Sequence, residues 1–188
     1  MSDRVAEEGL EGAEAGGAEA NPLLRSLKER FGERILAIEA FRGDATAVLA
    51  PAALLEVATF LRDEARPAFD MLLDVTAVDF LGRRPRFEIV YHLVSTGDAS
   101  RVRLKLPVEE ETPSVPSLVP VWPGANWLER ETFDMYGIRF DGHPDLRRIY
   151  LYDEFIGHPL RKDYPKQKRQ PLIGPGSPGE AGGQGGGR

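Results

Sequence analysis

Apolar positions recur with two different periods along the first two thirds of the chain. Residues 22–31 and 51–62 carry apolar side chains three or four positions apart, which is the spacing of an amphipathic helix. Five further runs are short, rich in apolar or β-branched residues and bounded by turn residues; they are residues 34–41, 46–50, 71–80, 86–95 and 101–108. Such runs are typical of strands.

Capping residues predict where the helices begin and end. Asn21 followed by Pro22 is a strong start for the first helix, because the asparagine side chain accepts free backbone N–H groups and proline fits the first helical turn. Asn126 predicts the start of a final helix, in which Glu129 takes the position of a capping-box acid and Gly137 the stop.

The resulting element order is α-β-β-α-β-β-β-α. This order predicts an α+β domain of two layers, in which helices cover one face of a small mixed sheet. We expect the domain to occupy residues 21–138, followed by an extended docking segment at 139–165. The acidic residues 1–20 and the Gly- and Pro-rich residues 166–188 hold too few apolar side chains to offset the entropy of ordering, so we expect both to be disordered tails.

Composition narrows the function classes. The chain has 188 residues and a formal charge of −6, which argues against nucleic acid as a main partner because phosphate backbones require a basic face. There is no cysteine, which excludes disulfides, iron–sulfur ligation and thiol catalysis by this chain. Neither a signal-peptide pattern nor an apolar run of about 18–20 residues is present, so the expected location is cytoplasmic.

Residues 142–165 form the most unusual stretch. The triplet Gly-His-Pro occurs twice, fifteen residues apart, and each copy leads into a leucine and two adjacent cations. The stretch lacks helical or strand periodicity, yet nine of its residues are large and apolar and its charges balance. Because an extended segment must still satisfy its backbone groups and cover its apolar side chains, we expect a partner protein to supply much of the surface on which it lies.

Catalytic and metal-binding interpretations of these residues stay open beside the docking interpretation. His143 and His158, with Asp145, are residue types that ligate zinc or iron, although each ring can equally order its own Gly-Pro turn through a hydrogen bond. Paired carboxylates perform acid–base catalysis, and Glu129 and Asp134 lie on the same predicted helix, where surface salt bridges are the simpler interpretation.

The cations of the stretch could bind phosphate, because arginine recognises phosphate with paired hydrogen bonds. Arg147, Arg148, Arg161 and Lys162 are accompanied by an equal number of carboxylates, however, and this balance favours docking to a protein. The chain contains neither a Walker-type loop nor a strand-linked dinucleotide glycine motif, so the sequence does not predict a nucleotide site.

Three consecutive motifs give the chain a family resemblance. ERETFDMYGI, GHPDLRR and GHPLRKD occur in this order, and upstream runs such as LLDVTAVDF and RFEIVYHLVS also agree. In these motifs the chain closely resembles the 30-kilodalton subunit, also called the C subunit, of NADH:quinone oxidoreductase, respiratory complex I. The resemblance is strong over residues 69–165 and loose over 21–68. The turn Tyr150-Leu151-Tyr152 departs from the family, which commonly has smaller residues or proline there.

The resemblance implies a non-catalytic subunit of the peripheral arm. On this interpretation FMN and the iron–sulfur clusters belong to partner subunits, the chain binds no cofactor itself, and it packs beside the quinone-site (49 kDa-type) and cluster-bearing subunits on the cytoplasmic side of the membrane. The motif residues would then hold the partners. These expected interface residues are Glu129, Arg130, Glu131, Asp134, His143, Arg147, Arg148, His158, Arg161, Lys162 and Asp163.

Two alternatives remain at this stage. The same type of subunit occurs in related membrane-bound hydrogenases and other quinone-linked dehydrogenases, and the sequence alone does not identify the electron donor. A stand-alone metal-dependent enzyme using the two Gly-His-Pro histidines is the second alternative.

Overall fold

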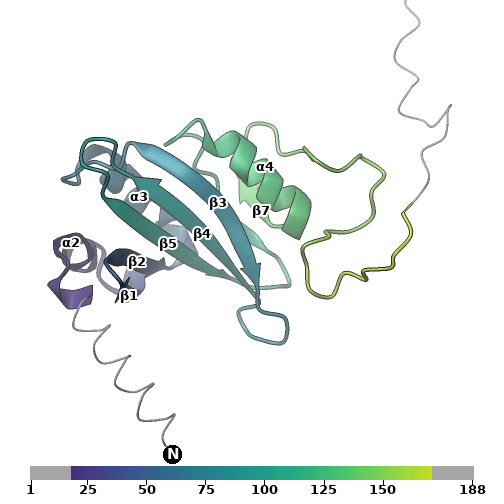
Figure 1. Cartoon of the computed structure of the whole chain (residues 1–188), viewed down its shortest axis with the longest axis horizontal. Coiled ribbons are helices and arrows are strands. Elements are labelled where there is room, and N and C mark those ends of the chain that lie inside the picture. Colours follow the sequence, from purple (N-terminus) through teal and green to yellow (C-terminus); the bar gives the residue numbers. More distant parts are fainter. Residues whose placement is uncertain (1–17, 171–188) are drawn as a thin grey trace, which may run out of the picture.

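The computed structural model describes residues 18–170, and the expected disorder of residues 1–17 and 171–188 lies outside the described residues (Figure 1). Two of the expected boundaries change. Residues 18–20 are helical and Ala18 is buried in the core, so the folded part begins before residue 21. At the other end, Gln170 hydrogen-bonds Ile156 and Tyr164, so residues 166–170 continue the ordered chain.

Five strands form one mixed sheet, as the sequence predicts. In spatial order they are β1 (Ile35–Phe41), β2 (Asp44–Leu49), β5 (Arg101–Val108), β4 (Phe87–Val94) and β3 (Met71–Asp79). The neighbours β2 and β5 run parallel and the other pairs run antiparallel. All five strands agree with the predicted ones to within two residues at each end.

Helices α2 (Pro22–Phe31) and α3 (Leu54–Asp63) lie behind the sheet in Figure 1. Asn21 caps α2 as predicted, because its side-chain oxygen accepts the backbone N–H groups of Leu23 and Leu24. The apolar stripes of both helices are buried in a common core with alternate residues of the central strands. The α+β prediction and its two-layer arrangement are therefore confirmed.

Helix α4 (Ala125–Tyr136) lies beside β3, and Gly137 ends it in the left-handed conformation with φ +73°. Its start differs from the prediction. Gly124 is the N-cap residue and no side chain caps the helix, so the capping roles expected of Asn126 and Glu129 are wrong. The side chain of Glu129 is instead fully buried and points toward the preceding loop.

Two short strands that the sequence did not indicate flank α4. They are β6 (Ser114–Pro116) and β7 (Arg139–Asp141), which pair in parallel. Three-residue strands are too short to show a period of two, and prolines surround β6. Because β7 belongs to this small sheet, the extended segment begins at residue 142. Residues 142–165 are called the strap below.

The strap contains neither a helix nor a strand. In Figure 1 it leaves β7, loops past the end of α4 and forms one side of the molecule. Along residues 18–170, every helix is too short or too polar to cross a lipid bilayer.

Candidate docking site on helix α4 and the strap

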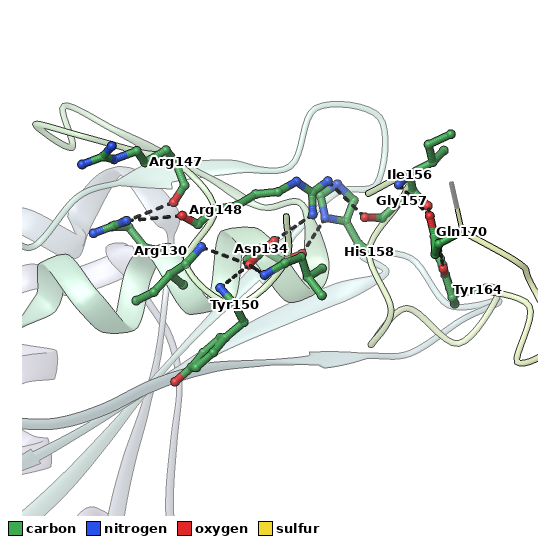
Figure 2. Close-up of polar contacts among 12 residues, drawn as sticks. Arg130, Asp134, Arg147, Arg148, Tyr150, Ile156, Gly157, His158, Tyr164 and Gln170 are labelled. Carbon is green, nitrogen blue, oxygen red and sulfur yellow. Dashed lines mark hydrogen bonds and ion pairs between the residues drawn. The ribbon is translucent and has the colours of Figure 1, made fainter. Parts of the chain in front are cut away.

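Asp134 fixes the middle of the strap to α4. This carboxylate is fully buried, and its Oδ2 accepts the backbone N–H groups of Ile149, Tyr150 and Leu151 at 3.1, 2.9 and 2.9 Å (Figure 2). Its Oδ1 accepts a hydrogen bond from Arg148 Nη1 at 2.7 Å. Burial alone would raise the pKa of Asp134, but the three amides and the guanidinium hold it below the ordinary value.

Arg130 complements Asp134 from one turn earlier on the helix. Its guanidinium donates to the backbone carbonyls of Arg147 and Arg148 at 3.2 and 3.3 Å, as Figure 2 shows. A buried cation thus binds carbonyls of the strap and a buried anion binds the next three amides. The strap needs no regular secondary structure here, because side chains of α4 satisfy its backbone polar groups.

The first Gly-His-Pro turn attaches near the start of α4. His143 Nε2 donates to the carbonyl of Asn126 at 3.1 Å, and His143 Nδ1 accepts the backbone N–H of Asp145 at 3.0 Å. A ring that donates with one nitrogen and accepts with the other is neutral. The interpretation in which each histidine orders its own turn is confirmed for this copy.

The second Gly-His-Pro turn attaches at the end of the same helix. His158 Nδ1 donates to the carbonyl of Asp134 at 2.9 Å. Burial lowers the pKa of His158, and the nearby guanidinium groups of Arg161 and Arg148 lower it further, so the ring is neutral at neutral pH. The repeated motif therefore binds two carbonyls of one helix, about two turns apart.

The strap also caps the C-terminus of α4. A helix leaves its last carbonyls without partners, and here the strap supplies donors for consecutive ones. Besides His158 on the carbonyl of Asp134, Leu160 N donates to Met135 at 3.2 Å and Arg161 Nε donates to Tyr136 at 2.6 Å. The tetrapeptide His-Pro-Leu-Arg is thus a capping segment supplied from a distant part of the sequence.

The far end of the strap is held by Arg86, which the sequence did not single out. Its guanidinium is 2% exposed and pairs with both oxygens of Asp79 at 2.9 Å, with Asp163 at 2.8 Å, and with Glu110. Asp79 also accepts the backbone N–H of Lys162 at 2.8 Å. Asp79 and Asp163 raise the pKa of Arg86, whose charge in turn lowers the pKa of both carboxyl groups. The signal in the sequence was a charged residue at each end of the β3–β4 hairpin.

Glu129 faces the other side of α4. Its two oxygens accept from Leu118 N and Ser117 Oγ, both at 2.6 Å, and burial raises its pKa to about 7. The buried hydroxyl of Tyr91, whose pKa burial and the charge of Glu129 raise, has no hydrogen-bond partner among the described residues. A salt bridge on the helix surface, the simpler expectation for Glu129, is therefore wrong.

The carboxylates of α4 do not meet in one catalytic site. Glu129 bonds the loop before the helix, Asp134 bonds the strap, and Glu131 Oε2 accepts from the hydroxyl of Tyr150 at 3.4 Å. Among residues 18–170, no three His, Asp or Glu side chains gather where they could hold a metal ion.

The strap cations do not converge on an anion site either. Arg147 pairs with Asp145 at 2.9 Å, Arg148 with Asp134, and Arg161 lies 5.1 Å from the centre of the Phe87 ring. The structure therefore brings together α4, both Gly-His-Pro turns and three arginines of the predicted set, but mostly through contacts within the chain. Glu129 and Asp134, fully buried, offer no surface to a partner; Glu131, Arg147, Lys162 and Asp163 are only partly buried or exposed.

Comparison with known proteins adds an independent observation. The family described as respiratory-chain NADH dehydrogenase, 30 Kd subunit, matches residues 47–170. The C subunit of the NADH-quinone oxidoreductase of Roseiflexus sp. (strain RS-1) is 50% identical over 143 residues, covering 76% of this chain and 82% of the relative. The same subunit of Geotalea uraniireducens (strain Rf4) is 45% identical over 159 residues, 84% of this chain and 96% of the relative. A solved trypsin-resistant fragment of Nqo5 superimposes with a TM-score of 0.55 at 36% identity, covering 66% of this chain and 98% of the fragment.

Proposed function

Because the chain belongs to the 30 kDa subunit family of respiratory-chain NADH dehydrogenases, and is thus a peripheral-arm subunit of NADH:quinone oxidoreductase, we propose that its own contribution is to dock and hold neighbouring subunits. On this proposal the chain performs no step of electron transfer. Its relatives carry the name of the quinone oxidoreductase throughout the similarity range, so a hydrogenase subunit is not favoured.

One observation carries the proposal: α4 directs its buried charges at the backbone of the strap. Asp134 and Arg130 are buried polar side chains, and both bind strap amides or carbonyls. Burying an aspartate and an arginine is costly unless each is well hydrogen-bonded, so this arrangement serves to hold an irregular segment in one shape. A segment held in one shape binds a partner with a smaller loss of entropy.

The cofactors fit this division of labour. The chain has no cysteine, so it offers no thiolate to an iron–sulfur cluster. We assign FMN and the clusters to the partner subunits and the quinone site to the 49 kDa-type neighbour, against which the strap would lie. Contact with the membrane is then indirect, through the assembled enzyme on its cytoplasmic side.

The test is isolation of the intact enzyme from gently solubilised membranes with an affinity tag on this chain. We expect the flavin-bearing, cluster-bearing and quinone-site subunits to co-purify in stoichiometric amounts, and the chain released by denaturant to contain neither flavin nor iron. Recovery of the chain alone would refute the proposal. Recovery with a nickel–iron large subunit would favour the hydrogenase alternative.

A further inference from the structure

Two large aromatic side chains next to the strap attachment are strongly exposed. Trp127 on α4 is 61% exposed and Tyr150 on the strap is 65% exposed, more than any of the other large apolar side chains that remain at the surface of the described chain. Single exposed apolar residues are common and need no explanation. These two belong to one patch, because the polar residues that hold them are neighbours on α4.

The patch is built around Arg130 and Glu131. The guanidinium carbon of Arg130 lies 5.1 Å from the centre of the Trp127 ring, while the hydroxyl of Tyr150 donates to Glu131 Oε2 at 3.4 Å. Trp127 and Glu131 are four residues apart on the helix and therefore share a face. In Figure 2 the ring of Tyr150 points away from the Asp134 carboxylate that binds its backbone.

Both rings are fixed before any partner arrives. Arg130 is itself anchored by two carbonyls of the strap, and the backbone N–H of Tyr150 is bound by Asp134 at 2.9 Å. Tryptophan, tyrosine and arginine are the residues that most often dominate binding energy at protein interfaces. Pre-ordered aromatic side chains give contact area at low entropic cost, which is the property of an anchor.

The charge around the patch specifies the partner. Glu131, Asp153 and Glu154 form no ion pair within residues 18–170, whereas Arg147 is paired with Asp145 and Arg130 is bound to carbonyls. Asp153 and Glu154 follow Tyr150 by three and four positions, within roughly 10–14 Å of chain. The unbalanced charge next to the aromatic pair is therefore negative, and it complements a basic rim.

We propose that Trp127 and Tyr150 are paired anchors that insert into apolar seats rimmed by lysine or arginine on a neighbouring subunit of the oxidoreductase. This inference rests on the proposed function, because it assumes that the chain is part of the assembled enzyme. It goes further in assigning the direct contact to two aromatic side chains rather than to the buried motif charges, which instead shape the strap.

The experiment places the photo-crosslinker p-benzoylphenylalanine at position 127 or 150 in the tagged chain and irradiates the intact enzyme. We expect both positions to crosslink to the same neighbouring subunit, at peptides that contain lysine or arginine. Crosslinks to a second copy of this chain or to lipid, or none at all in an enzyme that retains the chain, would overturn the inference. Failure of the chain to co-purify would instead refute the proposed function, so the two failures are distinguishable.

Truncation supplies an independent measurement. Trp127→Ala and Tyr150→Ala should each increase loss of the chain during purification in salt at least about tenfold, without changing the urea midpoint of the isolated chain. The matched control is Phe41→Ala, because Phe41 is 50% exposed, carries Arg42 5.0 Å from its ring centre and lies on β1. Equal loss from all three variants, or from none, would contradict a specific anchor role. Reversing the charges with Asp153→Lys and Glu154→Lys should mimic the truncations.

Discussion

The imidazole of His158 lies against Gly137, so closely that a Cβ atom at residue 137 would come within 2.5 Å of His158 Nε2. Gly137 has φ +73°, a conformation that L side chains rarely adopt. The glycine that ends α4 therefore has two requirements, one from its own backbone and one from a residue of the strap. The end of the helix and the attachment of the strap are a single structural unit.

Gly137→Ala should separate the strap from the end of α4. The left-handed backbone disfavours any Cβ, and the added methyl group meets the imidazole and Arg161 Nη2, so we expect the free energy of unfolding to fall by at least about 2 kcal/mol. Urea denaturation of the isolated chain measures this loss. The matched control is Gly124→Ala, since Gly124 has φ −62° and open space around it; a change there above about 1 kcal/mol would contradict the reasoning.

Asp134→Asn should destabilise the chain in a pH-dependent way. The asparagine cannot accept from three amides and a guanidinium together, and Arg148 would lose its anion, so a loss of about 3 kcal/mol is expected at neutral pH. Because the folded-state pKa of Asp134 is depressed, its stabilisation is present above the unfolded pKa of about 3.9 and disappears as the pH falls through the folded value. The difference between wild type and variant, measured in urea at pH 7, 4 and 3, should shrink below about pH 4. A constant difference would show that the charge is unimportant.

Glu129→Gln should act in the opposite sense. The folded-state pKa of Glu129 is raised to about 7, so its contribution to stability is fully present below the unfolded value near 4.3 and is lost as the pH rises through 7. Glutamine keeps an acceptor for Leu118 N without a buried charge. We expect the variant to gain on the wild type by roughly 3 kcal/mol between pH 4.5 and pH 7.5. Urea midpoints across that range provide the measurement, and parallel curves for the two proteins would exclude a titrating Glu129.

The sequence predicts the local features of this fold well. The strands follow from alternation, and the start of α2 follows from Asn21 and Pro22, because each depends on neighbouring residues. The predicted start of α4 was wrong because Glu129 fits the capping-box spacing yet bonds Ser117 and Leu118, eleven or twelve positions earlier. Spacing alone does not distinguish these roles.

The strap shows what local pattern leaves out. Its irregular character and the pairing of histidine with glycine and proline were visible, and the family motifs identified the residues that matter. Their partners were not visible, because Asp134 and His158, or Arg86 and Asp163, meet across long stretches of sequence. The motif charges were expected to face a partner subunit, and most of them instead bind the chain itself.

Arg147 and Arg161 allow this distinction to be tested, because the two arginines follow the two Gly-His-Pro turns at equivalent positions. Arg147 has a side chain that is 72% exposed and pairs only with Asp145, an arrangement that contributes about 0–1 kcal/mol to stability. Arg161 is partly buried over Phe87 and caps the carbonyl of Tyr136. The similar motifs therefore place one arginine at the surface and the other inside the strap attachment.

The two alanine variants should consequently differ. Arg161→Ala should lower the free energy of unfolding of the isolated chain by roughly 1–2 kcal/mol, because it removes a charged hydrogen bond and the packing of the side-chain stem. Arg147→Ala should leave that stability unchanged and, if its guanidinium contacts a neighbouring subunit, should reduce the NADH:quinone activity of assembled membranes by loss of the chain. Urea denaturation and activity of washed membranes are measured side by side for both variants. If Arg147→Ala unfolds the isolated chain while Arg161→Ala does not, the attachment of the strap is assigned to the wrong turn.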